Sequence, residues 1–240
     1  MIGEIIARRL SLIGRLSEED RRALERLPAQ VRDLRPGEDI LKEGDRPTVS
    51  IAVLEGFMYR YKISPQGGRQ IHSFYPKGET PCFETVPMET MDNNLAAIAP
   101  TRVAVMAHGD LMEVLNSQPH LRTLVWRETL VQAAIFREWL SRNSQMLAHA
   151  KMAHLFCEIM VRSRSLGAAK GDSCALPISQ QDLGDALGMT TVHVNRTLQL
   201  LRASGVVEFR SGVLHTPDLR KLMEIADFDP SYLHLRPEDV

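Results

Sequence analysis

The sequence predicts an α+β chain with an N-terminal antiparallel β-roll or jelly roll, one long helix, and a C-terminal winged helix-turn-helix. Three observations lead to this fold class. After residue 31, turns containing Gly or Pro recur about every ten residues between β-type segments, a spacing typical of small barrels and jelly rolls. The pattern from Pro119 to Leu147 is helical throughout. Residues 177–205 have the pattern of two short helices joined by a tight turn.

The composition indicates a globular protein that acts inside the cell. The chain has 240 residues, of which 44% are hydrophobic and 25% charged, enough for one large or two modest domains. A net charge of −1 excludes a generally basic nucleic-acid coat, although acidic residues elsewhere can offset a local basic surface. The opening segment is interrupted by Glu4, Arg8 and Arg9, and no apolar segment has membrane-spanning length. We therefore expect a cytoplasmic protein with no membrane partner.

The three cysteines do not form a recognisable framework. Cys82, Cys157 and Cys174 are odd in number and far apart in the sequence, and there is no CxxC pair. Disulfide frameworks and structural zinc sites need closely spaced or paired cysteines. We expect neither kind of site here.

Two short helices precede the β-region. Residues 2–14 suit an amphipathic helix. A second helix should begin after Ser17, which can act as N-cap with Asp20 in the capping-box position, and should end near Leu27. The β-type segments that follow are residues 50–54, 57–63, 70–75, 95–98 and 102–106.

The helical pattern resumes after Gly109. A short helix is expected over 110–116, and Pro119 can open the long helix. The long helix has apolar residues on more than one side, whereas a helix lying on a single sheet needs only one apolar stripe. We expect it to cover the β-region and also to meet a partner helix; the alternative is a single buried core helix. Another helix over 149–164 and a loop over 166–170 follow. We expect the chain to divide into the N-terminal helices with the β-roll (1–118), the long helix (119–147) and the winged helix-turn-helix region (148–240).

The segment 177–205 has the signals of a helix-turn-helix. Ser179 and Asp182 can form a capping box at the first helix. Gly188 stands where a left-handed residue ends that helix, and Thr190 can cap the next one. Small Gly184 lies where the two helices would approach closely.

The second helix and the segment after it have a polar surface that a core hairpin does not need. Thr197 is off-pattern, because an apolar residue usually packs at its position. Two β-type segments flank Ser211 and Gly212, which indicates a hairpin wing. An ordinary helical hairpin in a core is the alternative. The candidate DNA contacts are Gln180, Thr190, Thr191, Val192, His193, Asn195, Arg196, Gln199 and Arg210.

This order of elements resembles the CRP–FNR family of bacterial transcription regulators. The similarity is carried by LRPGEDILKEGD at 34–45, VLEGFMYRYKISPQGGRQIHSFYPKGE at 53–79 and QQDLGDALGMTTVHVNRTLQLLRASGVV at 180–207. The resemblance implies a homodimer joined along the long helices, with the 190–203 helix of each copy reading a palindromic operator whose half-sites lie about 34 Å apart. It also implies RNA polymerase as a partner.

The resemblance further implies roles for the recognition-helix residues. In the family a Glu and an Arg on this helix commonly read bases. Arg196 matches the Arg, whose fork suits guanine O6/N7 or a phosphate. Val192 or His193 stands near the Glu position, and Val192 can instead touch a thymine methyl group. Gln180 and the two threonines suit phosphate contacts. A solvated polar face is the alternative for each.

No effector follows from the sequence. Cyclic-nucleotide binders of the family hold the phosphate with an Arg-Ser pair, which would fall near Met91-Asp92-Asn93; no Arg is present and Asp92 would repel a phosphate, so we do not expect cyclic AMP. Because no cysteine precedes Cys82, an iron–sulfur cluster held by N-terminal cysteines is excluded. Haem stays open through His72, Cys82 and His108, whose alternative roles are ordinary strand or surface positions and a buried apolar thiol.

The alternative from another functional class is a cupin-like β-barrel metalloenzyme with an appended helical domain. Such an enzyme needs clustered His and Glu metal ligands. His72 and His108 are far apart in the sequence, and there is no His-x-His pair, Ser-His-Asp signature or phosphate-binding Gly loop. We therefore expect a regulator and no enzymatic activity.

Overall fold

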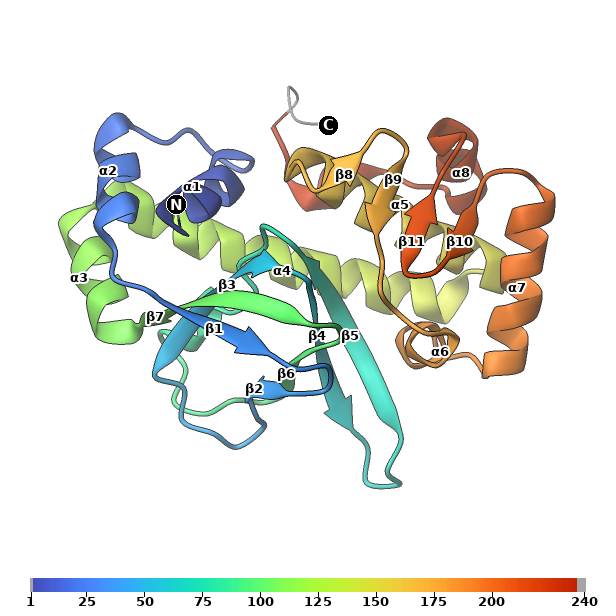
Figure 1. The fold of residues 1–240 in the computed structure, drawn as a ribbon, viewed down its shortest axis with the longest axis horizontal. Coiled ribbons are helices and arrows are strands. Elements are labelled where there is room, and N and C mark those ends of the chain that lie inside the picture. Colours follow the sequence, from blue (N-terminus) through green and yellow to red (C-terminus); the bar gives the residue numbers. More distant parts are fainter. Residues whose placement is uncertain (1, 237–240) are drawn as a thin grey trace.

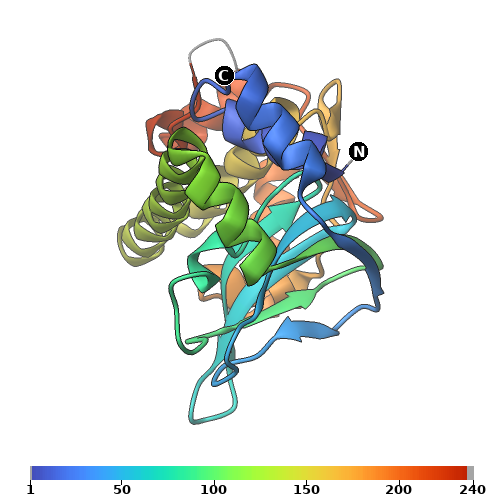
Figure 2. The same ribbon diagram turned by 90° about the vertical axis from the view of Figure 1, so that its left-hand side faces the viewer.

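The computed structural model describes residues 2–236 and has the predicted α+β architecture (Figure 1). A β-roll with an N-terminal helical cap is followed by the long helix α4 and by a C-terminal domain that contains the helix-turn-helix. α4 runs from the helical cap along one side of the roll to the C-terminal domain (Figures 1 and 2). Within residues 2–236, none of the helices combines the length and the apolar composition that a membrane span requires.

The two N-terminal helices form close to the predicted positions. They are α1 (Ile2–Ser11) and α2 (Glu18–Arg26). The predicted capping box is present at α2: the Ser17 hydroxyl accepts from the Asp20 amide, and the Asp20 carboxylate accepts from the Ser17 amide. This satisfies two backbone donors that the first turn otherwise leaves without partners.

The roll consists of two antiparallel sheets. One has the order β1 (Gln30–Leu34), β7 (Thr101–Ala107), β3 (Val49–Glu55), and the other β2 (Asp39–Leu41), β6 (Asn94–Ala97), β4 (Phe57–Ile63), β5 (Arg69–Pro76). A short 3-10 turn, η1 (Phe83–Thr85), follows β5. The sequence did not predict β1 or β2, because four of the five β1 residues are exposed and β2 has only three residues.

Three helices then lead to the C-terminal domain. They are α3 (His108–Ser117), α4 (Pro119–Gln145) and α5 (Ala148–Ser165), and Pro119 lies in the first turn of α4 as predicted. α4 buries one face that includes Val131 and Trp139, but leaves Trp126 and Leu130 more than half exposed. The alternative of a fully buried core helix is therefore wrong.

The C-terminal domain contains four helical segments and a small sheet. The helical segments are α6 (Gln180–Leu187), α7 (Thr191–Ala203), α8 (Leu219–Ala226) and the 3-10 turn η2 (Pro230–Leu233). The sheet has the order β10 (Glu208–Arg210), β11 (Val213–His215), β9 (Ser173–Ala175), β8 (Ala169–Lys170). The expected loop over 166–170 is thus partly wrong, because β8 is a two-residue strand that pairs with β9. Strands this short carry no periodic signal.

Candidate nucleic-acid interface

The first helix of the helix-turn-helix has the predicted start and end. Ser179 accepts from the Asp182 amide while the Asp182 carboxylate accepts from the Ser179 amide, so the capping box is formed. Gly188 has a φ of +64° and its amide donates to the Gly184 carbonyl. A residue with a Cβ is strained in this left-handed conformation, which explains the glycine at the end of α6.

Gly184 lies where the two helices approach most closely. A Cβ built on Gly184 would be 2.5 Å from the carbonyl oxygen of Met189, the residue in the turn before α7. The Met189 amide also donates to the Gly184 carbonyl at 3.0 Å. The missing side chain therefore sets how near the turn comes to α6.

α7 has one buried apolar face and begins with a side-chain cap. The Thr190 hydroxyl accepts from the His193 amide. Val194 and Leu198 are buried against the domain. The off-pattern Thr197 is also buried, and its hydroxyl donates to the His193 carbonyl at 2.8 Å. The hydroxyl thus finds a partner inside its own helix, which lets Thr197 occupy an apolar packing position.

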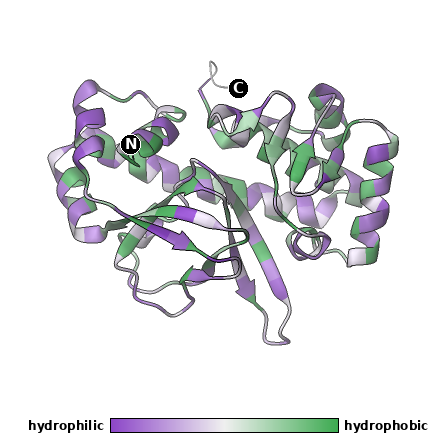
Figure 3. Ribbon diagram, in the orientation of Figure 1, coloured by the Kyte–Doolittle hydropathy of each residue, from purple (hydrophilic) through white to green (hydrophobic). Residues whose placement is uncertain are grey.

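The opposite face of α7 is exposed and mostly polar. Figure 3 shows hydrophilic and hydrophobic residues alternating along α7. Val192 is 72% exposed, so its methyl groups are free to contact a ligand. Leu200 is 60% exposed farther along the helix, and the sequence analysis did not single it out. The other candidate residues exposed at this helix are Thr190, Thr191, His193, Arg196 and Gln199.

Hydrogen bonds between side chains tie the two helices together at this face. Asn195 is half-buried and its amide group donates to Gln180 Oε1 at 3.3 Å, while Gln199 donates to Asn195 Oδ1 at 3.1 Å. The Thr191 hydroxyl donates to Gln181 Oε1 at 3.1 Å. Gln181 is exposed, and the sequence analysis missed it as a candidate. These bonds orient the polar groups before any ligand is present.

The wing forms beside α7 as predicted. Arg210 and Val213 are paired across a two-residue turn in which Ser211 and Gly212 both have positive φ, of 50° and 74°. This is the type I′ geometry favoured in two-residue hairpins. The Arg202 guanidinium of α7 donates to the Phe209 carbonyl of β10, which fixes the wing to α7. Arg210 is exposed at the tip.

An ion-pair clamp joins the first helix of the helix-turn-helix to the roll. Arg69 of β5 lies between two carboxylates of α6, with Nε 2.7 Å from Asp185 Oδ2 and the terminal nitrogen bonded to Asp182 Oδ1. The neighbouring Gln70 amide group donates to the Asp185 carbonyl at 2.8 Å. The single positive charge of Arg69 offsets one of the two negative charges of these α6 side chains, which reduces their repulsion of a phosphate backbone.

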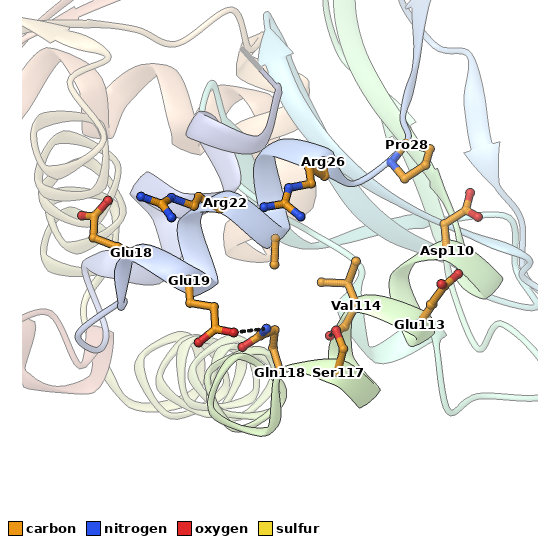
Figure 4. A pocket seen from close by; sticks show the side chains of 11 residues that line it. Glu18, Glu19, Arg22, Arg26, Pro28, Asp110, Glu113, Val114, Ser117 and Gln118 are labelled. Atoms are coloured by element: carbon orange, nitrogen blue, oxygen red, sulfur yellow. Dashed lines mark hydrogen bonds between the residues drawn. The ribbon is translucent and has the colours of Figure 1, made fainter.

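Two of the hollows in the described part of the chain lie away from α7, one beside α4 and one between α2 and α3. One, of about 380 Å³, lies between the roll and α4 and is lined by both basic and acidic side chains, including Arg60, His72, Glu84 and Asp92. The other, of about 760 Å³, lies between α2 and α3 (Figure 4). Its walls carry charges of both signs, and Gln118 donates to Glu19 across one end.

The three residues considered as possible haem ligands, His72, Cys82 and His108, lie in three different environments. His72 lines the hollow between roll and α4 and packs edge-on against Phe136. Cys82 is fully buried, and its sulfur accepts from the Ile51 amide. His108 Nε2 is 3.0 Å from the Thr85 hydroxyl. Among the described residues there is no group of three or more His, Cys, Asp or Glu side chains placed to hold a metal ion.

All three cysteines are free and buried. Burial raises the pKa of Cys82 to about 12 and that of Cys174 to about 11, and it also raises the pKa of Cys157. Because the thiolate is the reactive form, burial disfavours reaction of these three thiols in this conformation.

Comparison with known proteins identifies the C-terminal region. Residues 150–225 match the Crp-like helix-turn-helix domain. The nitrogen fixation regulation protein FixK of Bradyrhizobium diazoefficiens is 28% identical over 191 residues, covering 79% of each chain. The electron transport regulator A of Shewanella oneidensis is 23% identical over 193 residues, covering 80% of this chain and 77% of its own.

The fold is similar to the solved structures of two other proteins. The structure of FixK2 from Bradyrhizobium japonicum has a TM-score of 0.71 at 22% identity, covering 83% of this chain and 98% of that one. A CooA mutant from Carboxydothermus hydrogenoformans has a TM-score of 0.62 at 13% identity, covering 82% and 88%. At these identities the structures establish the fold, and the matched domain with the regulator relatives excludes the cupin-like metalloenzyme. The chain therefore belongs to the CRP–FNR family of transcription regulators, which are DNA-binding proteins and not enzymes.

Proposed function

We propose that the chain acts as a homodimer that reads a palindromic operator with α7, and that its effector is not cyclic AMP. The observation that carries the DNA-binding mode is the exposed N-terminal half of α7, where a capped helix end, polar side chains and Val192 face outward beside the wing. A helix presented in this way has the length and polarity to enter a major groove.

A second copy of this chain is the proposed occupant of the exposed face of α4. Trp126, Leu130 and Leu140 are 66%, 54% and 66% exposed, and Ala133 lies between them on the same stripe. The spacing of four, three and seven residues is that of a seam between two parallel helices. The opposite face of α4 is already buried against its own chain. Two-fold symmetry would then present two α7 helices to half-sites about 34 Å apart.

The individual contacts follow from side-chain chemistry. Arg196 would take guanine O6/N7 or a phosphate, and Val192 would meet a thymine methyl group. Gln180, Thr190 and Thr191, at the start of the two helices, would bind phosphates together with Arg210 of the wing. His193, Asn195 and Gln199 would complete the polar contact face.

The hollow between roll and α4 supports the exclusion of cyclic AMP. Arg60 of its lining is already bonded to the Glu84 carboxylate, to the Pro81 carbonyl and, at 3.1 Å, to the Tyr75 hydroxyl, and Lys62 is paired with Glu43 at 3.0 Å. Asp92 adds a second carboxylate to the lining. Two carboxylates and an engaged arginine disfavour a phosphate ligand.

Action on chromosomal DNA would place the protein in the cytoplasm, with RNA polymerase as its partner. Residues 1–118 would then act as the sensor part, residues 119–147 as the dimerisation helix and residues 148–240 as the DNA-binding part.

The test is selection of duplexes from a random DNA pool by the purified full-length protein. We expect enrichment of a two-fold palindrome. Arg196→Ala should then weaken binding to that sequence by about 1–3 kcal/mol. The matched control is Arg220→Ala, which removes the same charge from an exposed position on α8 and should leave operator binding unchanged. Equal effects of the two substitutions would contradict base reading by Arg196.

A further inference from the structure

A chain of hydrogen bonds runs from the roll to the first residue of α7. Arg69 Nε of β5 donates to Asp185 Oδ2 of α6 at 2.7 Å, and the other oxygen of that carboxylate accepts from Gln181 Nε2 at 2.7 Å. Gln181 Oε1 in turn accepts from the Thr191 hydroxyl at 3.1 Å. Four side chains from three elements are thus connected end to end.

The charged end of this chain fixes which groups donate and which accept. A guanidinium group can only donate and a carboxylate can only accept, so Asp185 receives a hydrogen from Arg69 on one oxygen and from Gln181 on the other. The NH2 group of Gln181 must therefore face Asp185, and its oxygen must face Thr191. A side-chain amide can otherwise be turned around by 180°, but here only one orientation keeps both hydrogen bonds.

The orientation of Gln181 determines what Thr191 offers to DNA. A hydroxyl group has one hydrogen and two lone pairs, and the Gln181 oxygen takes the hydrogen of Thr191. Because Thr191 is exposed, the lone pairs of its oxygen are what it presents to a ligand. They are a poor match for a phosphate oxygen, which also only accepts. They match the amino group of adenine or of cytosine in the major groove.

A second chain of hydrogen bonds at the same face consists of neutral amides. Gln199 donates to Asn195 at 3.1 Å, and Asn195 donates to Gln180 at 3.3 Å. Each of these amides carries both donors and an acceptor, so the three can turn over together and keep their hydrogen bonds. This second chain can adapt to either kind of base edge. The chain that ends at Asp185 cannot, because turning Gln181 over would break its hydrogen bond to a charged group.

Two further contacts hold the charged end of the first chain in place. Arg69 is bonded at the same time to Asp182, which belongs to the capping box of α6. The Gln70 amide group donates to the main-chain carbonyl of Asp185 at 2.8 Å. Hydrogen bonds to charged groups are stronger than those between neutral groups. The roll therefore holds the end of the chain from which the other orientations follow.

We propose that Asp185, held by Arg69, is a positioning residue that sets one of the base preferences of the protein. Through Gln181 it makes the Thr191 hydroxyl an acceptor, which selects adenine or cytosine at one position of each half-site. This rests on the proposed function, because α7 must lie in the major groove with its N-terminal residues at the base edges. The phosphate contact of Thr191 then falls to its main-chain amide in the first turn of α7, where an amide has no intrahelical acceptor.

Replacing Asp185 with asparagine should reverse the chain. In Asp185→Asn the new amide oxygen stays on Arg69, which can only donate, and the new NH2 group faces Gln181. Gln181 must then turn its oxygen toward that group and its own NH2 group toward Thr191. The Thr191 hydroxyl now accepts from Gln181 and directs its hydrogen outward, where guanine O6 and N7 or thymine O4 can accept it. The substitution thus exchanges one pair of preferred bases for the other.

The experiment selects duplexes from a random pool with the full-length wild type, Thr191→Val, Thr191→Ser and Asp185→Asn. Thr191→Val keeps the shape and removes the hydroxyl, so the position at which it loses its preference is the position that Thr191 reads. Affinities are then measured with each of the four bases at that position. We expect wild type and Thr191→Ser to prefer adenine or cytosine by about three- to tenfold, and Asp185→Asn to prefer guanine or thymine.

The matched control is Gln70→Leu, which removes a hydrogen bond between the same strand and α6 but leaves the chain from Arg69 to Thr191 intact. It should keep the wild-type base preference, whatever its effect on overall affinity. An unchanged preference in Asp185→Asn, or an equal loss of affinity for all four bases, would overturn the proposal. So would a Thr191→Val variant that keeps every preference of the wild type. Selection of no palindrome by the wild type would instead refute the proposed function, and this proposal with it.

Discussion

Replacing Gly184 with alanine tests how closely the two helices of the helix-turn-helix must pack. The new Cβ would lie 2.5 Å from the Met189 carbonyl oxygen, about 0.9 Å inside the 3.4 Å at which ordinary contact begins. The obstacle is backbone, so no side chain can rotate away. The turn and the start of α7 must move instead.

Two effects of opposite sign decide the outcome. Alanine improves the helix propensity of α6 by about 1 kcal/mol relative to glycine. Forcing an extra carbon into a packed contact costs about 1–3 kcal/mol, and a rigid backbone neighbour places the cost in the upper part of that range. We therefore expect Gly184→Ala to lower the free energy of unfolding by about 1–2 kcal/mol. Operator affinity should also fall, because α7 shifts relative to α6.

The assay is denaturant unfolding of the full chain together with operator binding, and Gly109→Ala is the matched control. Gly109 is also a helical glycine, in α3, but a Cβ there meets nothing within 4 Å. Its replacement should raise the free energy of unfolding by up to about 1 kcal/mol and leave operator affinity unchanged. If both substitutions stabilise the protein equally, the close approach at Gly184 does not control the packing and the reasoning is refuted.

Three further predictions concern the clamp, the dimer and acid stability. Arg69→Gln should cost about 1–3 kcal/mol by leaving two carboxylates without their cation; a double-mutant cycle with Asp185→Asn measures the coupling, and additive effects would contradict a direct pair. Leu130→Lys should convert the proposed dimer to a monomer, because it places a charge in the apolar stripe of α4; an unchanged mass in sedimentation equilibrium would argue against that interface. Burial and the nearby Arg142 lower the pKa of His154 to about 4, so stability should decline as the pH falls from about 6.5 toward that value, by about 3 kcal/mol in total. His154→Gln should flatten this decline in acid unfolding curves, and a profile that keeps its slope would mean that other groups cause it.

The local features of the candidate interface could be predicted from sequence because their partners are near in the chain. The capping boxes at Ser17 and Ser179 join residues three apart, and the glycine that ends α6 needs only its own φ. The Ser211-Gly212 turn likewise depends only on the positive φ of its own two residues. Such features depend on backbone stereochemistry and on side chains within one helical turn, so the sequence states them directly. The exposure of Leu200 was not predictable, because it depends on what the rest of the domain leaves uncovered.

The sequence by itself determined the order of the main elements and the helix-turn-helix with its wing, and it supplied the candidate DNA contacts. The tertiary structure decided which charged residues pair between the β-roll and the C-terminal helices. Arg69 meets Asp185 across 116 positions of chain, and Arg162 meets Glu79 across 83. No local pattern marks either arginine as a partner, since a charged residue in a strand or helix has the same appearance whether it faces solvent or a distant carboxylate. The burial of Glu128 in α4 arises in the same way, because only the packing of other elements, including Arg9 of α1, removes its carboxyl group from water.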